Sequence, residues 1–133
     1  MKSIDHLGLS VRSLDDALLL FVDLLGLELS HRGEVETPPV RYAFVKVPSG
    51  ALLELAEYGD ERLGDQLGVV DHFAFEVADI EATVADLKVL GIEVDRSKPQ
   101  SQERPDGTVL TVSTMPEQTL GIRIQLVERG IDE

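Results

Sequence analysis

Cysteine is absent from this sequence. Its absence excludes disulfide bonds and thiolate chemistry, so a bound metal ion has to be held by histidine, carboxylate or amide groups. Long apolar runs are also absent, since no stretch approaches the roughly 18 residues that span a bilayer. The first residues do not form a basic segment followed by an apolar one, as a secretion signal would. We therefore expect a cytoplasmic protein without a membrane partner.

Positive charge is scarce. Twelve Lys and Arg residues stand against 25 Asp and Glu residues, which gives a formal net charge of −13. This balance opposes binding to nucleic acid or to anionic lipid surfaces, but a local cluster can still bind a small anionic substrate. The length of 133 residues, with 43% hydrophobic and 28% charged residues, indicates a single soluble globular domain.

Two segments of the chain share one pattern. IDHLGLSV at residues 4–11 and VDHFAFEV at residues 70–77 both read aliphatic, Asp, His, apolar, small, apolar, any residue, Val. The histidines, His6 and His72, are therefore 66 positions apart at matching points of a repeat. We predict two copies of one unit, each of which delivers an imidazole to a shared place.

A helix is expected after each of these segments. Ser13 is a plausible N-cap with Asp16 at the capping-box position, and Gly26 ends the helix. Asp79 and Gly91 occupy the same places in the second copy. The expected apolar stripes are Leu14, Ala17, Leu18, Phe21, Leu24 and Leu25 in the first helix, and Ile80, Val84, Leu87 and Leu90 in the second. Both helices should lie on a sheet.

The remaining segments predict strands. Each helix leads into a short strand, and hairpins are expected at 40–47 with 51–57 and at 108–114 with 121–128. Segments 30–39 and 95–107 are interpreted as surface loops. The predicted fold is α+β, with two tandem βαβββ modules whose curved mixed sheets form a metal-binding cavity. A single domain, 1–133, would then consist of module 1 (1–57), a linker (58–68) and module 2 (69–133).

Strand alternation indicates where the polar residues of these strands point. His6 and His72 lie opposite the apolar face of the two first strands, and Glu54 and Gln125 lie opposite that of the two last strands. If both sheets curve around a common cavity, the four side chains can converge. Two imidazole nitrogens, a carboxylate oxygen and an amide oxygen suit a divalent ion such as Zn, Ni, Co, Mn or Fe.

The paired DHLGLSV and DHFAFEV strands, their capped helices, and the LLELAE and IRIQLVE strands resemble the vicinal oxygen chelate superfamily. This family includes glyoxalase I, methylmalonyl-CoA epimerase, extradiol dioxygenases and fosfomycin- and bleomycin-resistance proteins. The resemblance covers nearly the whole chain. It implies the glyoxalase/bleomycin resistance/dioxygenase fold, one divalent ion per site and a homodimer. The family takes its ligands from the first and last strands of each module, which here are His6, Glu54, His72 and Gln125.

The ligand set resembles that of the glyoxalase and epimerase branches. Extradiol dioxygenases and fosfomycin-resistance enzymes generally carry two His and a Glu in the last strand, where this chain has Gln125, and the bleomycin-binding branch generally lacks the set. The segment at 70–94 is very similar to the second half of methylmalonyl-CoA epimerases, although SQERPDGTV and VETPPV replace two segments expected there. Glyoxalase I tends to have an Asn-containing segment after its first Glu ligand, and AEYGDERLG has none.

The resemblance implies an isomerase or lyase that moves a proton at a carbon next to a carbonyl, through a metal-stabilised enolate or enediolate. The substrate would be an acyl-CoA or a glutathione adduct. Methylmalonyl-CoA epimerase is the most similar activity, and the alternatives are a lactoylglutathione lyase or a non-catalytic protein that binds a small molecule or drug.

Individual residues receive roles within this interpretation. Glu54 is the expected catalytic base, as in glyoxalase I, and Glu76, on the face of His72, is the nearest candidate for a second catalytic base. Arg123, on the face of Gln125, is expected to bind a substrate carboxylate or phosphate. The weaker candidates for substrate binding are Arg41, Lys46 and Arg104. Asp5 and Asp71 point to the other face as strand-edge or capping partners, and Glu57 and Glu128 are expected to be solvated.

Overall fold

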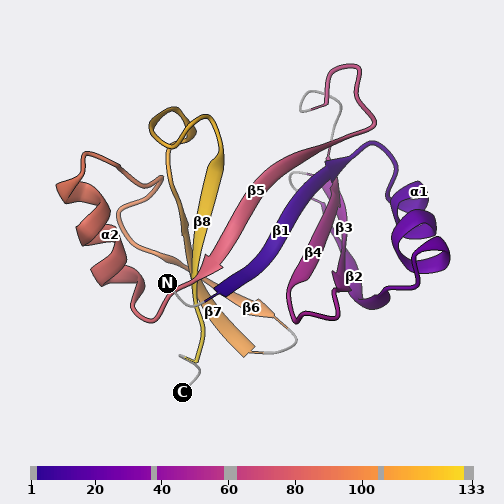
Figure 1. Cartoon of the computed structure of the whole chain (residues 1–133), viewed down its shortest axis with the longest axis horizontal. Helices are drawn as coiled ribbons and strands as arrows, with labels where there is room; N and C mark the ends of the chain where they lie inside the picture. The colour runs from indigo at the N-terminus through magenta and orange to yellow at the C-terminus, as the bar shows by residue number, and fades with distance from the viewer. Residues whose placement is uncertain (1–2, 37–38, 59–62, 105–106, 131–133) are drawn as a thin grey trace. The chain divides into compact units, whose positions relative to one another are not determined.

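The computed structural model describes every residue except 1–2, 37–38, 59–62, 105–106 and 131–133 (Figure 1). The chain divides into two compact units. The first unit is His6–Asp71, and the second consists of Met1–Asp5 and His72–Glu133. Each boundary falls immediately before one of the two repeated histidines. The expected linker at 58–68 lies partly outside the described residues.

The first unit has the order strand, helix, strand, strand, strand. Its elements are β1 (Ser3–Val11, of which His6–Val11 belongs here), α1 (Leu14–Leu18), a π-helix (Leu19–Leu24), β2 (Glu28–Glu36), β3 (Pro39–Lys46) and β4 (Leu52–Glu57). The strands lie in the order β2-β3-β4-β1. The β2–β3 and β3–β4 pairs are antiparallel and the β4–β1 pair is parallel, so the sheet is mixed.

The second unit repeats this order. Its elements are β5 (Gly68–Glu76, of which His72–Glu76 belongs here), α2 (Ile80–Val89), β6 (Gln100–Arg104), β7 (Gly107–Ser113), a 3₁₀ turn (Pro116–Gln118) and β8 (Arg123–Glu128). The strands lie in the order β6-β7-β8-β5, with only the β5–β8 pair of these parallel. The predicted α+β class, with a βαβββ order used twice, is confirmed.

Both helices begin and end where the sequence predicts. Ser13 Oγ accepts a hydrogen bond from the Asp16 amide at 3.1 Å, and Asp79 Oδ1 accepts one from the Ala82 amide at 3.1 Å. Gly26 and Gly91 follow with positive φ values of 78° and 84°, the left-handed conformation that commonly ends a helix. In the part of the chain that the structure describes, no helix has the length and apolar character needed to cross a bilayer.

The first helix changes its pitch after Leu18, where it continues as a π-helix. A π-helix has more residues per turn than an α-helix, so the residues that follow are rotated about the axis. Leu24 and Leu25, which were expected in the apolar stripe, are therefore 70% and 60% exposed, and Val22 packs against the core instead. The buried core of this unit is formed by Val11, Leu14, Ala17, Ala43, Val45 and Leu55.

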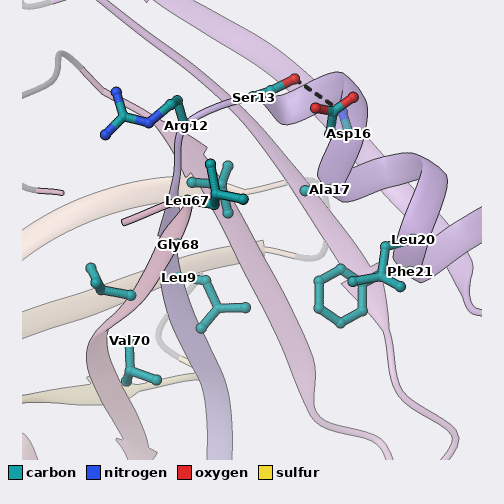
Figure 2. Close-up of a pocket in the computed structure, with 12 residues that line it drawn as sticks. Leu9, Arg12, Ser13, Asp16, Ala17, Leu20, Phe21, Leu67, Gly68 and Val70 are labelled. Carbon is teal, nitrogen blue, oxygen red and sulfur yellow. Dashed lines mark hydrogen bonds between the residues drawn. The ribbon is translucent and has the colours of Figure 1, made fainter. Parts of the chain in front are cut away.

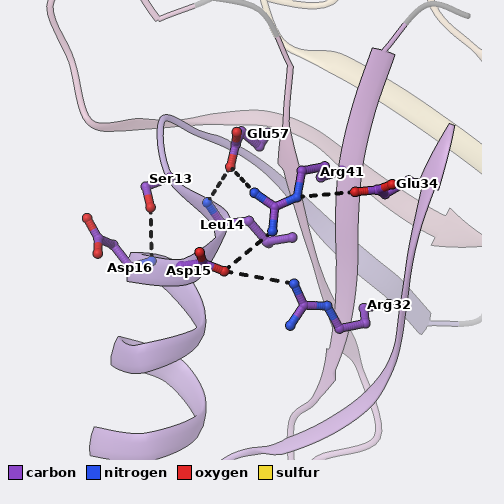
Figure 3. Close-up of polar contacts among 8 residues, drawn as sticks. All are labelled: Ser13, Leu14, Asp15, Asp16, Arg32, Glu34, Arg41 and Glu57. Carbon is purple, nitrogen blue, oxygen red and sulfur yellow. Dashed lines mark hydrogen bonds and ion pairs between the residues drawn. The ribbon is translucent and has the colours of Figure 1, made fainter. Parts of the chain in front are cut away.

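Two glutamates that were expected in solvent contact the helix N-termini. Glu57 Oε1 accepts a hydrogen bond from the Leu14 amide at 2.8 Å, and Glu128 Oε1 accepts one from the Ile80 amide at 2.9 Å. Glu57 also pairs with Arg41 at 3.4 Å (Figure 3). The expectation was wrong because strand alternation does not reveal which unsatisfied N–H groups lie beside a strand end. In both modules the last residue of the last strand caps the helix.

Two segments that were interpreted as loops contain strands. β2 extends to Glu36 and pairs along its length with β3, and β6 occupies residues 100–104. Within its unit each lies at the end of the strand order, where side chains are exposed and polar residues are tolerated. An alternating apolar pattern is therefore weak in both, and this is why the sequence did not reveal them.

Candidate metal centre

A first half-site, which we define as His6 and Glu54, lies on one face of the sheet of the first unit. Leu55, the neighbour of Glu54 in β4, packs in the core with Leu14 of α1, so alternation turns Glu54 to the face away from the helix. Gly8 pairs with Glu54 in the parallel β1–β4 register, which makes His6 and Glu54 diagonal neighbours. Because both ligand types project from adjacent strands to one side, they can meet.

The distance between the two side chains suits a shared metal ion. His6 Nε2 lies 3.4 Å from Glu54 Oε1. Two ligand atoms at about 2.1 Å from a tetrahedral ion lie about 3.4 Å apart, so the spacing of this pair is compatible with a zinc-type ion. The His6 side chain is 1% exposed and that of Glu54 is 23% exposed. The imidazole is thus held inside the protein while the carboxylate stays reachable.

The aromatic ring of Phe44 lies against the His6 imidazole. The Phe44 ring contacts it edge to face, with centroids 6.0 Å apart. The His31 ring stacks on the Phe44 ring, with centroids 4.8 Å apart and nearly parallel planes. Phe44 pairs with His31 in β2 and with Glu54 in β4, so these three residues form one row across the sheet. Phe44 therefore lies beside both members of the first half-site.

A second half-site, which we define as His72 and Gln125, lies at the equivalent place in the second unit. Ala74 pairs with Gln125 in the parallel β5–β8 register, just as Gly8 pairs with Glu54. His72 is 4% exposed. Gln125 Oε1 is buried and has no hydrogen-bond partner among the described residues. A buried acceptor without a donor costs about 1 to 3 kcal/mol, and a bound cation would satisfy this oxygen.

Arg123 contacts His72, which the sequence did not reveal. The two residues are register partners in β8 and β5, and Arg123 Nη2 lies 3.1 Å from His72 Nδ1. A guanidinium can only donate hydrogen bonds, so Nδ1 has to be the acceptor. The side chain that was expected to bind substrate therefore lies against a predicted metal ligand.

Two further residues share these faces by strand alternation. Glu76 lies on the face of His72 and is half-buried, as expected for a carboxylate at the edge of a site. Ser10 lies on the face of His6, and its buried Oγ has no partner among the residues that the structure describes. Sequence reasoning missed Ser10, although its parity with His6 would have indicated it.

The three weaker cation candidates are used inside their own units. Arg41 pairs with Glu57 and with Asp15 near the start of α1, as Figure 3 shows. Lys46 Nζ lies 3.7 Å from Glu28. Arg104 pairs with the buried Asp5 at 3.4 Å. These contacts stabilise the sheet and the helix, so they give no support to a role in substrate binding.

A cavity of about 500 Å³ lies in the first unit (Figure 2). Neither member of the first half-site lines it. Its lining is mainly apolar and includes Leu9, Val11, Ala17, Leu20 and Phe21. Leu9 and Val11 belong to the helix-facing side of β1, whereas His6 points to the opposite side. Arg12, at the edge of the cavity, donates hydrogen bonds to the carbonyl oxygens of Gly64 and Gln66. The cavity therefore gives no access to His6 and Glu54.

Comparisons with solved structures found several methylmalonyl-CoA epimerases. One, in complex with methylmalonyl-CoA and NH4+, is 26% identical with a TM-score of 0.82, and the match covers 100% of this chain and 98% of that chain. A variant of the enzyme from Streptomyces coelicolor, in complex with 2-nitronate-propionyl-CoA, is 26% identical with a TM-score of 0.79 and coverage of 98% and 99%. The enzyme from Mycobacterium tuberculosis is 24% identical with a TM-score of 0.80, and the match covers 96% of this chain and 88% of that chain. It has the same fold.

A comparison with curated proteins found no match. A comparison with sequence families matched residues 5–111, which contain nearly all of the first module and most of the second. The matched family contains the vicinal oxygen chelate proteins that the repeated strands resemble. The chain belongs to the glyoxalase/bleomycin resistance protein/dioxygenase superfamily.

Proposed function

We propose that the two half-sites share one divalent ion, held by His6, Glu54, His72 and Gln125. The observation that carries this proposal is their equivalence: in each module a buried first-strand histidine is the diagonal neighbour of a last-strand oxygen ligand, at the same register offset. The 3.4 Å spacing in the first half-site and the buried Gln125 Oε1 without a partner support it.

One of the two connections between the units lies directly beside a proposed ligand. Asp5 belongs to the second unit, where its carboxylate pairs with Arg129 at 2.6 Å and with Arg104 at 3.4 Å. His6 is the next residue and belongs to the first unit. A peptide bond therefore joins a ligand of one half-site to a residue fixed within the unit that carries the other half-site.

We propose further that the protein is an epimerase-type isomerase, which moves a proton at the carbon next to the carbonyl of an acyl thioester. Support comes from the two similar epimerases at 26% identity, one of which holds methylmalonyl-CoA. A divalent ion in the centre would polarise the carbonyl oxygen of the substrate and make the neighbouring proton more acidic. The remaining roles belong to side chains of this chain.

Glu54 is the proposed base that removes the proton. Its carboxylate is partly exposed beside the buried His6, so it can reach a substrate while staying oriented. Gln125 cannot take up a proton, because an amide is not basic. An epimerase has to return the proton to the other face of the carbon, which requires a second group. Glu76, on the same strand face as His72, is the proposed second base.

Deuterium exchange tests this proposal. The metal-loaded protein should exchange the α-proton of methylmalonyl-CoA in deuterium oxide. Glu54→Gln should lower the exchange rate by at least about 100-fold, since general base catalysis contributes factors of that size. Glu76→Gln should lower epimerisation more than exchange, because one base still removes the proton. Glu117→Gln, an exposed carboxylate of the 3₁₀ turn, is the matched control and should leave both rates unchanged.

The outcomes separate the candidate activities. A metal-loaded protein that exchanges no α-proton would contradict the epimerase proposal. Conversion of the methylglyoxal–glutathione hemithioacetal in its place would identify a lactoylglutathione lyase. Binding of either compound without turnover would identify a small-molecule-binding protein.

A further inference from the structure

The hydrogen bond from Arg123 to His72 Nδ1 conflicts with metal binding by His72. Among metal-binding histidines, the nitrogen that does not bind the ion almost always donates its hydrogen to a carboxylate, a carbonyl or water. Here the partner of Nδ1 is a guanidinium, which carries five N–H donors and no acceptor. His72 is 4% exposed, so water cannot readily replace this partner.

The conflict exists whichever nitrogen binds the ion. If Nδ1 is the ligand atom, it cannot at the same time accept a hydrogen bond from Arg123. If Nε2 is the ligand atom, a neutral imidazole has its hydrogen on Nδ1, and two N–H donors would then face each other at 3.1 Å. In both cases Arg123 has to leave Nδ1 before His72 can take part in the centre.

We infer that Arg123 blocks His72 in the absence of the ion and moves away from it when the ion binds. We call this hydrogen bond the Arg123 lock. This inference rests on the proposed shared ion. In the metal-free protein the Arg123 guanidinium donates a hydrogen bond to His72 Nδ1, so the hydrogen of the imidazole is on Nε2. Loading of the ion breaks this contact and releases the guanidinium, which is then available to a carboxylate or phosphate of the substrate. Arg123 is thus a positioning residue whose two partners exclude each other.

The lock lowers the affinity of the centre for its ion. Only the fraction of molecules in which Arg123 has left Nδ1 can bind, so the apparent dissociation constant rises as that fraction falls. The positive charge of the guanidinium beside a divalent cation acts in the same direction. Since a hydrogen bond to a charged group has to be broken, removal of the lock should tighten binding by about tenfold or more.

Calorimetric titration with Co2+ tests the inference on the full chain after removal of bound metal. Arg123→Met removes the charge and the donors and keeps much of the side-chain volume. It should bind Co2+ at least about tenfold more tightly than the natural sequence. Arg96→Met is the matched control, because it removes the same charge from the same unit at a residue that is 45% exposed and contacts its neighbour Asp95. Its dissociation constant should stay within about twofold.

The outcomes distinguish the two proposals. If the natural protein binds one ion and Arg123→Met binds it equally or more weakly, the lock is wrong and the shared centre stands. If neither protein binds the ion, the shared centre is wrong and the lock falls with it. Tighter binding by Arg123→Met but not by Arg96→Met supports the lock.

Nitrogen NMR of the histidine side chains gives an independent test that needs no variant of Arg123. The chain has only three histidines, so His72 can be assigned with a His72→Gln variant. Because Nδ1 accepts the hydrogen bond from Arg123, metal-free His72 should carry its hydrogen on Nε2. The pattern should change when one equivalent of Zn2+ is added. A hydrogen on Nδ1 of the metal-free protein would overturn the inference.

Discussion

Buried polar side chains in this protein are of two kinds. Asp5 is satisfied within its unit, because two arginines pair with its carboxylate. Gln125 Oε1 and Ser10 Oγ are not satisfied by any described residue, and both lie on the faces that carry the predicted ligands. A buried polar atom without a partner lowers stability, so it is kept where another requirement outweighs that loss. Binding of the proposed ion and substrate would be such a requirement.

Gln125→Met tests this trade between stability and binding. The change removes the buried oxygen without a partner and keeps the volume, so the metal-free protein should gain about 1 kcal/mol in free energy of unfolding, or about 3 to 5 °C in Tm. The affinity for Co2+ should fall at least tenfold, because one ligand is lost. Thermal unfolding after chelation and calorimetry measure the two effects. Gln66→Met, at an exposed position, should change neither, and a destabilised Gln125→Met would contradict the interpretation.

Asp5→Asn tests the buried ion pair. The Asp5 side chain is 4% exposed, so the substitution removes a buried negative charge that contacts two partly buried guanidiniums. The free energy of unfolding in urea should fall by about 3 kcal/mol. Asp15→Asn is the matched control, since Asp15 also pairs with two arginines but is 73% exposed. It should change stability by less than about 0.5 kcal/mol. Equal effects of the two variants would show that burial does not govern this pair.

Sequence reasoning at this scale predicted the faces of residues but not their contacts. Alternation correctly turned Glu54 away from the helix, because its neighbour Leu55 belongs to the core. Alternation could not show that the Arg123 side chain turns toward His72. That contact depends on the rotamer of Arg123 and on which strand lies beside β8. The strand face on which a polar residue lies can be predicted from the alternation of the sequence. The residue that it contacts can be known only from the folded structure.

At the scale of elements, each helix is joined to its module at its first turn. The N-cap residues Ser13 and Asp79 were predictable, because their contacts lie three residues along the chain. The contacts of Glu57 and Glu128 span 43 and 48 residues, so no local pattern reveals them. The same limit explains the strands missed in the expected loops: β2 and β6 are held by pairing with β3 and β7 and not by an apolar alternation of their own.

Glu128→Ala tests the link between β8 and α2. Loss of a carboxylate at a helix N-terminus removes both a hydrogen bond to the Ile80 amide and a favourable charge, so the free energy of unfolding should fall by about 1 to 2 kcal/mol. Hydrogen exchange of the Ile80 amide should become faster. Glu128→Gln keeps an acceptor and should lose less. Glu117→Ala, at an exposed position, is the control, and an unchanged Ile80 exchange rate in Glu128→Ala would contradict the link.

At the scale of the whole molecule, duplication explains why the four proposed ligands occupy matching positions in the two modules. Each module has the same βαβββ order, the same parallel pairing of its first and last strands and the same register offset. Within that shared frame the last-strand ligand differs: Glu54 is basic and Gln125 is not. Repetition thus supplies a symmetric set of positions, and one substitution in one copy makes the two sides of the proposed centre chemically different.

If the two half-sites share one ion, loss of a ligand from either half-site should abolish binding of that ion. Metal-free protein should bind one Zn2+ per chain, and His6→Gln and His72→Gln should each abolish stoichiometric binding, although these histidines belong to different units. Two independent sites would leave each variant with one ion. At a free concentration of 100 times the dissociation constant, Zn2+ should stabilise the natural protein by about 2.7 kcal/mol and neither variant. His31→Gln should keep the ion, because His31 stacks on Phe44 and does not belong to the ligand set. If a single chain builds the proposed centre, an equimolar mixture of the His6 and His72 variants should not recover binding, and recovery would show that two chains build it.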